Sequence, residues 1–335
     1  MKDTFKQFGI AIAGSGSATP AATLDNTQLA QMVETSDEWI TTRTGIQTRH
    51  LATSGETLAQ LAARAGQTAI AMANLSPEDI DLIVLATSTP DDLFGSAAKI
   101  QGEIGATRAV AFDLTAACSG FVFGMVTAAQ FIRTGVYRNV LLLGADVLSR
   151  WVDWDDRGTC ILFGDGAGAV VMQATEDRDR LLGFSLHSNG QKNHTLNLSQ
   201  QAESQALLPG LEVGRGQYRS ITMNGREVYR FAVDKVPEVI SKALYHADLA
   251  TDEIDWLLLH QANQRIMDAV ANRLNLPAEK VISNLAKYGN TSAASIPLAL
   301  DEAVCEGKVK TGDRIAVSGF GAGLTWGAAI FEWGI

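Results

Sequence analysis

Short runs of apolar residues, each bounded by glycine or polar turn residues, recur along the chain. Runs of this length and composition are typical of strands that are buried on both faces of a sheet. Two longer segments, 57–73 and 232–247, instead place apolar residues at helical spacing. The alternation of strands and helices predicts an α/β fold built of packed layers. The predicted strands are 8–16, 80–89, 139–146, 167–172, 254–260 and 314–321.

The pattern of the first half returns in the second half. SPEDIDLIVLATS (76–88) corresponds to ATDEIDWLLLHQA (250–262), since each begins with a helix start signal and continues into a buried strand with a polar end. DLTAACSGFVFGMVTAAQFI, from Asp113, corresponds to NLAKYGNTSAASIPLALDEAV, from Asn284. Each of these has a strand end, a turn of small residues and a buried helix. We therefore predict a duplicated chain whose halves, 1–181 and 182–335, pack as five layers, α-β-α-β-α.

A polar segment lies between the halves. Residues 185–225 are rich in glutamine and show neither strand nor helix periodicity. Loops of this length are commonly functional covers or mobile segments. We expect an irregular excursion here.

Composition and charge narrow the classes of partner. A chain of 335 residues with 46% hydrophobic residues is long enough to bury a sizeable core. The net charge of −10 argues against nucleic acid or an anionic membrane surface as the main partner. No run approaches the roughly 20 apolar residues of a membrane-spanning helix. An anionic partner would need a local basic patch.

The cysteines indicate a reducing compartment. Cys118, Cys160 and Cys305 are scattered and odd in number, with no paired spacing. Neither a disulfide framework nor a zinc site is therefore predicted. We expect a cytoplasmic protein.

Three polar residues sit at predicted strand ends in the duplicated pattern: Cys118, His260 and Asn290. Open α/β sheets place ligands at such ends. A thiol at a helix N-terminus favours the thiolate form, because the macrodipole and free N–H groups stabilise negative charge. The plainer alternatives are an inert core thiol, a strand-end histidine with satisfied hydrogen bonds and an ordinary Asn-Thr turn. Convergence of the three side chains would favour catalysis.

Motifs around these residues closely resemble those of the β-ketoacyl-[acyl-carrier-protein] synthase III family, in the thiolase superfamily. They are TAACSGF, FGDGAGA, LLHQAN, YGNTSAASIPLAL and GFGAGLTWG, with TSDEWITTRTGI near the start. The resemblance implies a thiolase fold and a homodimer. It also implies condensation of an acyl-CoA primer, expected to be acetyl-CoA, with malonyl-acyl carrier protein to start fatty acid synthesis.

The resemblance assigns roles to the three residues. Cys118 would take the acyl group as a thioester, and the helix that follows would lower its pKa. His260, as a neutral imidazole, and Asn290 would donate hydrogen bonds to the malonyl thioester oxygen while CO₂ leaves. Backbone N–H groups of Cys118 and Ala322 would form the oxyanion hole. No metal or bound redox cofactor is implied.

Substrate-binding positions also carry over. Trp39 and Arg157 match a pair that sandwiches the CoA adenine, and Arg43 matches a residue at the CoA phosphates. Gly225 and Asn263 would line the pantetheine tunnel. A solvated aromatic is the alternative for Trp39.

The remaining matched position is Phe94, which corresponds to an aromatic residue that closes the acyl pocket across the dimer.

The acidic carrier protein would need a basic patch on which to dock. The predicted patch lacks the basic residue that the family usually has at the position of Asn272. The alternative interpretation is that its arginines are ordinary solvated residues. The patch consists of Arg226, Arg230, Arg265 and Arg273.

Two other functions remain open from the sequence. One is a condensing enzyme of secondary metabolism with the same three residues, and the other is a non-catalytic acyl-CoA-binding scaffold. An intact Cys-His-Asn set argues against the scaffold.

Overall fold

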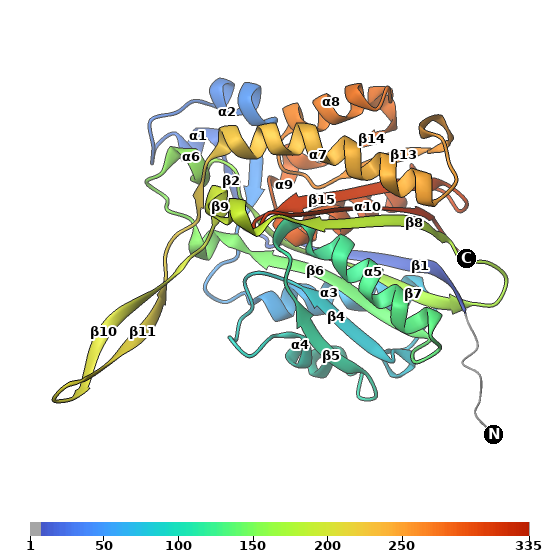
Figure 1. The fold of residues 1–335 in the computed structure, drawn as a ribbon, viewed down its shortest axis with the longest axis horizontal. Coiled ribbons are helices and arrows are strands. Elements are labelled where there is room, and N and C mark those ends of the chain that lie inside the picture. Colours follow the sequence, from blue (N-terminus) through green and yellow to red (C-terminus); the bar gives the residue numbers. More distant parts are fainter. Residues whose placement is uncertain (1–7, 335) are drawn as a thin grey trace.

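The computed structural model describes residues 8–334 and contains two five-stranded sheets (Figure 1). The first sheet has the order β1-β7-β6-β4-β5. Strands β4, β5 and β6 are parallel, β7 is antiparallel to β6, and β1 is antiparallel to β7. The strands are β1 (Gly9–Ala18), β4 (Leu82–Ala86), β5 (Val110–Leu114), β6 (Asn139–Val147) and β7 (Asp165–Thr175).

The second sheet repeats this topology with the order β14-β13-β15-β16-β8. Strand β13 is parallel to β14 and β15, whereas β16 is antiparallel to β15 and β8. Each strand therefore has a counterpart at the same place in the first sheet, as the sequence repeats predict. The strands are β8 (Leu181–Ser188), β13 (Trp256–Leu259), β14 (Val281–Ile282), β15 (Arg314–Gly321) and β16 (Thr325–Glu332).

Helices form three layers around the two sheets (Figure 1). Helices α5 (Gly120–Arg133) and α10 (Ser295–Cys305) lie between the sheets. Helices α3 (Leu58–Met72) and α4 (Ala97–Ile104) cover the first sheet, and α7 (Gly225–His246) covers the second, with α8 (Gln264–Arg273) packed on α7. The predicted five-layer α-β-α-β-α arrangement is confirmed.

Local sequence explains where these helices begin and which face they bury. Thr57 caps α3 by accepting the Gln60 N–H at 3.1 Å, and the Gln60 side chain accepts the Thr57 N–H in return. The buried residues of α3 form one stripe, because only one face meets a sheet. In contrast α5 is apolar nearly all round, since it lies between two sheets.

The segment 185–225 is more regular than predicted. After β8 comes a long hairpin of β10 (Gln200–Leu208) and β11 (Leu211–Tyr218), which projects from the body (Figure 1). Every residue of both strands is exposed, so no buried face leaves a hydrophobic pattern in the sequence. Short strands β9 (Leu196–Asn197) and β12 (Thr222–Met223) pair at its base.

Helix α7 also begins earlier than predicted, at Gly225, because Asn224 caps it by accepting the Glu227 N–H. No helix within residues 8–334 is long and apolar enough to cross a membrane. The remaining elements are β2 (Thr23–Asp25), β3 (Thr48–His50), α1 (Asn26–Leu29), α2 (Asp37–Thr44), α6 (Arg157–Cys160), α9 (Leu285–Tyr288) and the 3₁₀ turns η1 (Pro77–Asp79), η2 (Ala117–Ser119), η3 (Leu148–Trp151), η4 (Gly190–Thr195), η5 (Thr251–Glu253), η6 (Ala278–Lys280) and η7 (Ser292–Ala294).

Candidate active site

Cys118 lies on a tight turn between a strand and a central helix. It belongs to the 3₁₀ turn η2, which joins β5 to α5. The preceding residue, Ala117, has a left-handed backbone with φ of 47°. Such a conformation is unfavourable for a residue with a Cβ and persists only where the surroundings impose it. The turn leaves Cys118 only 7% exposed, with its side chain at the wall of a cavity.

Two glycines of β15 allow the second sheet to approach this turn closely. A Cβ on Gly319 would lie 2.9 Å from Ser119 Cα, and one on Gly321 would lie 2.8 Å from the Cys118 nitrogen. Any side chain at these positions would therefore displace the turn. The GFG sequence at the end of β15 thus fixes the backbone of Cys118 from the other half of the chain.

His260 follows β13 and is almost completely buried. Its Nδ1 lies 2.7 Å from Ser295 Oγ, and its ring meets Phe320 edge to face. Burial lowers the pKa of His260 to about 3, so the imidazole is neutral at physiological pH. With Nδ1 accepting the hydroxyl proton of Ser295, the Nε2–H is left as a donor. A neutral imidazole with a free N–H is the form that the family resemblance implies for this residue.

Asn290 is held by its backbone and by its own amide. Its N–H donates to Leu162 O at 2.9 Å, and its carbonyl accepts the Gly164 N–H at 3.0 Å. The side-chain Oδ1 accepts the Ser292 N–H at 2.9 Å. The amide NH₂ of Asn290 is therefore the group available to a ligand.

Two cavities meet at Cys118. One, of about 480 Å³, is lined by His260 and Asn290 inside and by Arg43 toward its surface end. The other, of about 920 Å³, is lined by apolar side chains, including Leu93, and by polar ones such as Thr115 and Asn193. Cys118, Phe163 and Leu196 line both. The three sequence-predicted catalytic residues thus share one cavity, and the thiol also reaches a second.

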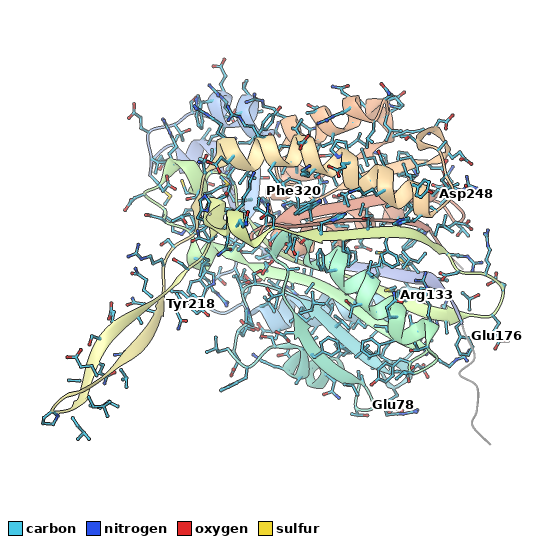
Figure 2. The ribbon with its side chains drawn as sticks, viewed as in Figure 1. Glu78, Arg133, Glu176, Tyr218, Asp248 and Phe320 are labelled. Carbon is cyan, nitrogen blue, oxygen red and sulfur yellow. The ribbon has the colours of Figure 1, made fainter. Side chains whose placement is uncertain are left out.

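The larger cavity extends toward the base of the hairpin. Tyr218, labelled in Figure 2, lines it and packs edge to face on Trp151, with ring centroids 5.9 Å apart. Ala322 lines the same cavity near the thiol. Phe320, also labelled in Figure 2, instead lines the smaller cavity beside His260.

The prediction that the helix lowers the pKa of Cys118 is wrong for the free chain. Burial raises the pKa of this thiol to about 12, and the negative charge of Asp146 contributes in the same direction. A hydrogen bond from Ser292 opposes the increase but does not cancel it. Desolvation therefore outweighs the helix N-terminus, and the resting group is a neutral thiol.

The predicted adenine pair is already in contact. The Arg157 guanidinium lies 4.9 Å from the Trp39 ring centroid, and that of Arg43 lies 5.7 Å from it. Arg157 also donates to Glu34 O at 2.8 Å. A purine between indole and guanidinium would need about 7 Å, or two van der Waals contacts. In the free chain Arg157 therefore occupies the face of Trp39 that an adenine would use.

Gly225 and Asn263 line the smaller cavity, as predicted for a pantetheine tunnel. Asn263 also has a structural part, since its Oδ1 caps α8 through the Arg265 N–H and its Nδ2 donates to Arg43 O at 3.1 Å. Phe94 is completely exposed in the single chain. Its neighbour Leu93 lines the larger cavity instead.

The four predicted docking arginines are all exposed. Arg226 and Arg265 line the smaller cavity, and the Arg265 guanidinium lies 5.7 Å from the Tyr229 ring on α7. Arg273 turns to the same helix, where it donates to Val233 O and lies 3.6 Å from Asp234. Arg265 and Arg273 therefore share the side of α8 that faces α7.

Sequence reasoning missed three polar residues beneath the site. Ser292 donates to Cys118 Sγ at 3.3 Å, Ser295 contacts His260, and Asp146 is buried behind both turns. Ser292 and Ser295 lie within the YGNTSAASIPLAL motif, so the signal for them was the run of hydroxyls in that motif. Nothing in the local sequence marks Asp146.

Known proteins are similar to this chain in both sequence and fold. Two family models match, one described as 3-oxoacyl-[acyl-carrier-protein] synthase III over residues 112–190 and one as its C-terminal part over residues 244–333. The chain is 69% identical to the β-ketoacyl-[acyl-carrier-protein] synthase III of Trichormus variabilis, covering 98% of this chain and 99% of that protein. It is 70% identical to that of a Nostoc species, with the same coverage.

A solved structure agrees over nearly the whole chain. The 3-oxoacyl-[acyl-carrier-protein] synthase III of Aquifex aeolicus matches with a TM-score of 0.89 and 45% identity, covering 97% of this chain and all of that one. The sequence motifs, the duplicated fold and these relatives agree. The chain belongs to the β-ketoacyl-[acyl-carrier-protein] synthase III family.

Proposed function

We propose that this enzyme starts fatty acid synthesis by condensing an acyl-CoA primer, with acetyl-CoA as the expected primer, with malonyl-acyl carrier protein. Family membership supports the reaction, and the position of Cys118 supports the mechanism. The thiol borders both the cavity with the two hydrogen-bond donors and the larger cavity. A nucleophile at such a junction can hold an acyl chain on one side and receive a second thioester on the other.

The first half-reaction loads the acyl group onto Cys118. Its sulfur attacks the thioester carbonyl, the carbon–sulfur bond to CoA breaks, and the electron pair leaves on the CoA sulfur. Backbone N–H groups of Cys118 and Ala322 stabilise the oxyanion that forms on the carbonyl oxygen. Trp39, Arg43 and Arg157 bind the CoA headgroup outside the tunnel.

The second half-reaction uses the donors in the same tunnel. Malonyl-carrier protein places its thioester oxygen against the Nε2–H of His260 and the NH₂ of Asn290. Loss of CO₂ leaves an enolate that these donors stabilise, and its carbon attacks the Cys118 thioester. A carbon–carbon bond forms, the Cys118 thiolate is expelled, and 3-oxoacyl-carrier protein leaves. The CoA thioester is a substrate, and the chemistry needs no resident metal or redox cofactor.

We also propose that the enzyme is a homodimer in the cytoplasm. A two-stranded hairpin is marginally stable in water, yet β10 and β11 expose Leu207, Leu208 and Leu211. The fully exposed Phe94 lies next to a residue of the larger cavity. A second copy that covers these residues would close the cavity with Phe94. Light scattering is expected to give twice the chain mass, and a monomer would contradict the proposal. A reducing cytoplasm keeps the Cys118 thiol free.

The assignment of Cys118 can be tested directly. Incubation with acetyl-CoA is expected to add one acetyl group to the wild-type enzyme, located on Cys118 by mass spectrometry of peptides. Cys118→Ala is expected to fold normally, because alanine is small and apolar, but to form neither the adduct nor product. Cys160→Ala is the matched control, since Cys160 is also buried but lies outside both cavities. Product formation by Cys118→Ala would refute the assignment.

A further inference from the structure

Asp146 is a fully buried carboxyl group at the end of β6. Its Oδ1 accepts the Thr87 hydroxyl at 3.1 Å, the Ser88 N–H at 2.8 Å and the Thr89 hydroxyl at 2.9 Å. Its Oδ2 accepts the Ala293 N–H at 3.2 Å. Within residues 8–334, no lysine or arginine forms an ion pair with it. A buried carboxyl without a cation is costly, and it calls for an explanation.

Ser292 connects this carboxyl group to the Cys118 thiol. The Ser292 hydroxyl donates to Cys118 Sγ at 3.3 Å. The next residue, Ala293, donates its N–H to Asp146, and hydrogen bonding from the Ser292 hydroxyl lowers the pKa of this carboxyl group. The left-handed backbone of Ser292, with φ of 52°, places it there, just as the left-handed Ala117 places Cys118 in the other half of the chain. A hydroxyl has one proton, so Ser292 either donates it to Sγ or turns it to Asp146 and accepts the Cys118 S–H. In the second arrangement the sulfur, the hydroxyl and the carboxyl group form one continuous chain.

We propose that Asp146 accepts the thiol proton of Cys118 through the Ser292 hydroxyl during acylation, and returns it when condensation expels the thiolate. The inference rests on the proposed function, in which Cys118 is the nucleophile. Ser292, which contacts the reacting sulfur, relays the proton, and Asp146 stores it.

The proton and charge balance over the whole cycle. As Sγ bonds to the acyl carbon, the S–H proton passes to Ser292 Oγ, the Ser292 proton passes to an Asp146 oxygen, and CoA leaves as a thiolate. The acyl-enzyme then holds a neutral Asp146 carboxylic acid. When the malonyl-derived enolate expels Cys118 as a thiolate, the two protons move back and restore the thiol and the carboxylate.

Burial makes this exchange feasible, because it raises the pKa values of both Cys118 and Asp146. A negative charge on either Cys118 or Asp146 disfavours a negative charge on the other. The pair therefore holds one negative charge, whichever of the two groups carries it. Protonation of Asp146 costs less than it would for an exposed carboxyl. The unusual environment of Asp146 therefore suits a temporary proton acceptor.

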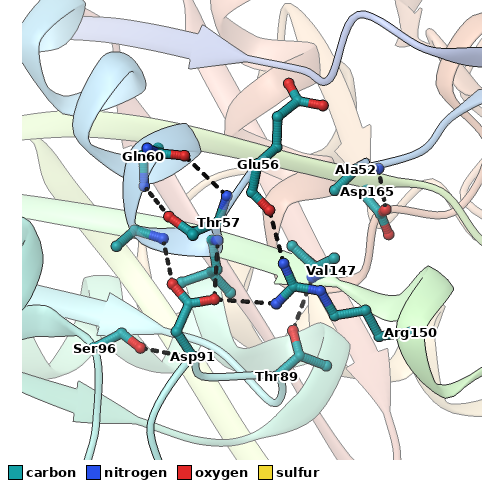
Figure 3. A network of polar contacts seen from close by, with 12 residues as sticks. Ala52, Glu56, Thr57, Gln60, Thr89, Asp91, Ser96, Val147, Arg150 and Asp165 are labelled. Carbon is teal, nitrogen blue, oxygen red and sulfur yellow. Dashed lines mark hydrogen bonds and ion pairs between the residues drawn. The ribbon is translucent and has the colours of Figure 1, made fainter. Parts of the chain in front are cut away.

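The other titratable groups around the site are less suitable. His260 has Nδ1 at Ser295, and burial holds its pKa near 3, so it is a poor proton acceptor. Asp165, on the neighbouring strand β7, accepts the Ala52 N–H (Figure 3). It also accepts the backbone N–H and the hydroxyl of Ser149. Arg150 is directed to Asp91 and Glu56 in the same network (Figure 3). Of these groups, only Asp146 has a hydrogen-bonded connection to Sγ.

The experiment compares pH profiles of Cys118 reactivity in Asp146→Asn, Ser292→Ala and the wild type. Single-turnover acylation by acetyl-CoA and alkylation by iodoacetamide are both followed. Alanine is compatible with the backbone at 292, since Ala117 adopts the same conformation in the matching turn. Asp165→Asn is the control, because it removes another buried carboxyl that has no connection to the thiol.

Asp146→Asn and Ser292→Ala are both expected to react at least about tenfold more slowly than wild type at pH 7. Their rates should then rise about tenfold per pH unit, because hydroxide must now generate the thiolate of a high-pKa thiol. The Asp165→Asn profile should parallel that of the wild type. If Asp146→Asn fails to fold, Ser292→Ala decides alone, since it leaves the four other hydrogen bonds of Asp146 in place.

Variant profiles parallel to the wild type, even at a uniformly lower rate, would overturn the relay while leaving the proposed function standing. A wild-type enzyme that is not acylated on Cys118 would overturn the proposed function and this inference with it.

Discussion

The 2.7 Å contact between Ser295 Oγ and His260 Nδ1 determines the chemistry available to this histidine. Because Ser295 Oγ also lies 3.4 Å from the Gln261 N–H, which it accepts, its own proton can point to Nδ1. The imidazole then presents Nε2–H to the tunnel. Asn290 presents its NH₂ for a similar reason, since Oδ1 is already bonded to the Ser292 N–H. Both residues are thus prepared as donors rather than as bases.

His260→Ala and Asn290→Ala are therefore expected to separate the two half-reactions. Each should still acylate Cys118 but lose malonyl decarboxylation by about 10²–10³-fold, because one donor to the enolate is removed. Since burial holds the pKa of His260 near 3, histidine protonation should not reduce the wild-type decarboxylation rate between pH 7 and pH 5. Release of labelled CO₂ and the mass of the acyl-enzyme measure the two steps. Equal losses in both steps would contradict this division of roles.

At the residue scale, the sequence motifs predicted which residues form the site better than they predicted the surroundings of those residues. Cys118, His260 and Asn290 could be selected because each follows a strand in the duplicated pattern. The direction of the pKa shift of Cys118 could not be predicted from the motifs, because it depends on burial by the second sheet and on Asp146, which is distant in the sequence. Asp146 is linked to the site by contacts with segments 58 and 147 positions away, which no local pattern reveals.

At the element scale, the site depends on how closely β15 packs against η2. Glycines at 319 and 321 remove the side chains that would separate them, so the turn of one half is seated on a strand of the other. This joins the thiol of the first half to the donors of the second. The geometry of the site is therefore sensitive to single atoms on β15.

Gly319→Ala is expected to reduce Cys118 acylation and to destabilise the fold by about 1–3 kcal/mol, because its Cβ would lie 2.9 Å from Ser119 Cα. Gly102→Ala on α4 is the control. A Cβ there meets nothing within 4 Å, so this substitution should stabilise the helix by up to about 1 kcal/mol. Chemical denaturation and single-turnover acylation measure both effects. An unchanged acylation rate in Gly319→Ala would show that the turn tolerates displacement.

Elements with a buried face were predictable and those without one were not. The strands at 139–146 and 314–321 appear in the structure nearly as predicted, since core packing imposes an apolar run. The hairpin β10–β11 has no buried residue in the single chain, so its alternation carries no burial signal. The first seven residues of α7 were missed for a similar reason, because they include three charged residues, two of them arginines, and none of the seven is buried.

At the scale of the whole molecule, a net charge of −10 conflicts with binding an acidic carrier protein. The conflict is reduced if the carrier meets only a local field, since charges are screened over about 8–10 Å. Arg43, Arg226 and Arg265 all line the cavity that leads to Cys118. This arrangement supports docking at the mouth of that cavity, whereas the pairing of Arg273 with Asp234 weakens its part in the patch.

Arg265→Glu is expected to raise the KM for malonyl-carrier protein at low salt, because it reverses the charge at the cavity mouth where the carrier would dock. The increase should shrink at high salt, since screening weakens the repulsion that the new carboxylate adds. Acylation of Cys118 is measured with acetyl-N-acetylcysteamine, an uncharged thioester, and should be nearly unaffected. Arg64→Glu is the matched control, because Arg64 is exposed on α3 in the opposite outer layer and the net charge changes equally. Equal effects of the two substitutions would mean that net charge alone governs the encounter, and no effect of either would place carrier docking elsewhere on the molecule.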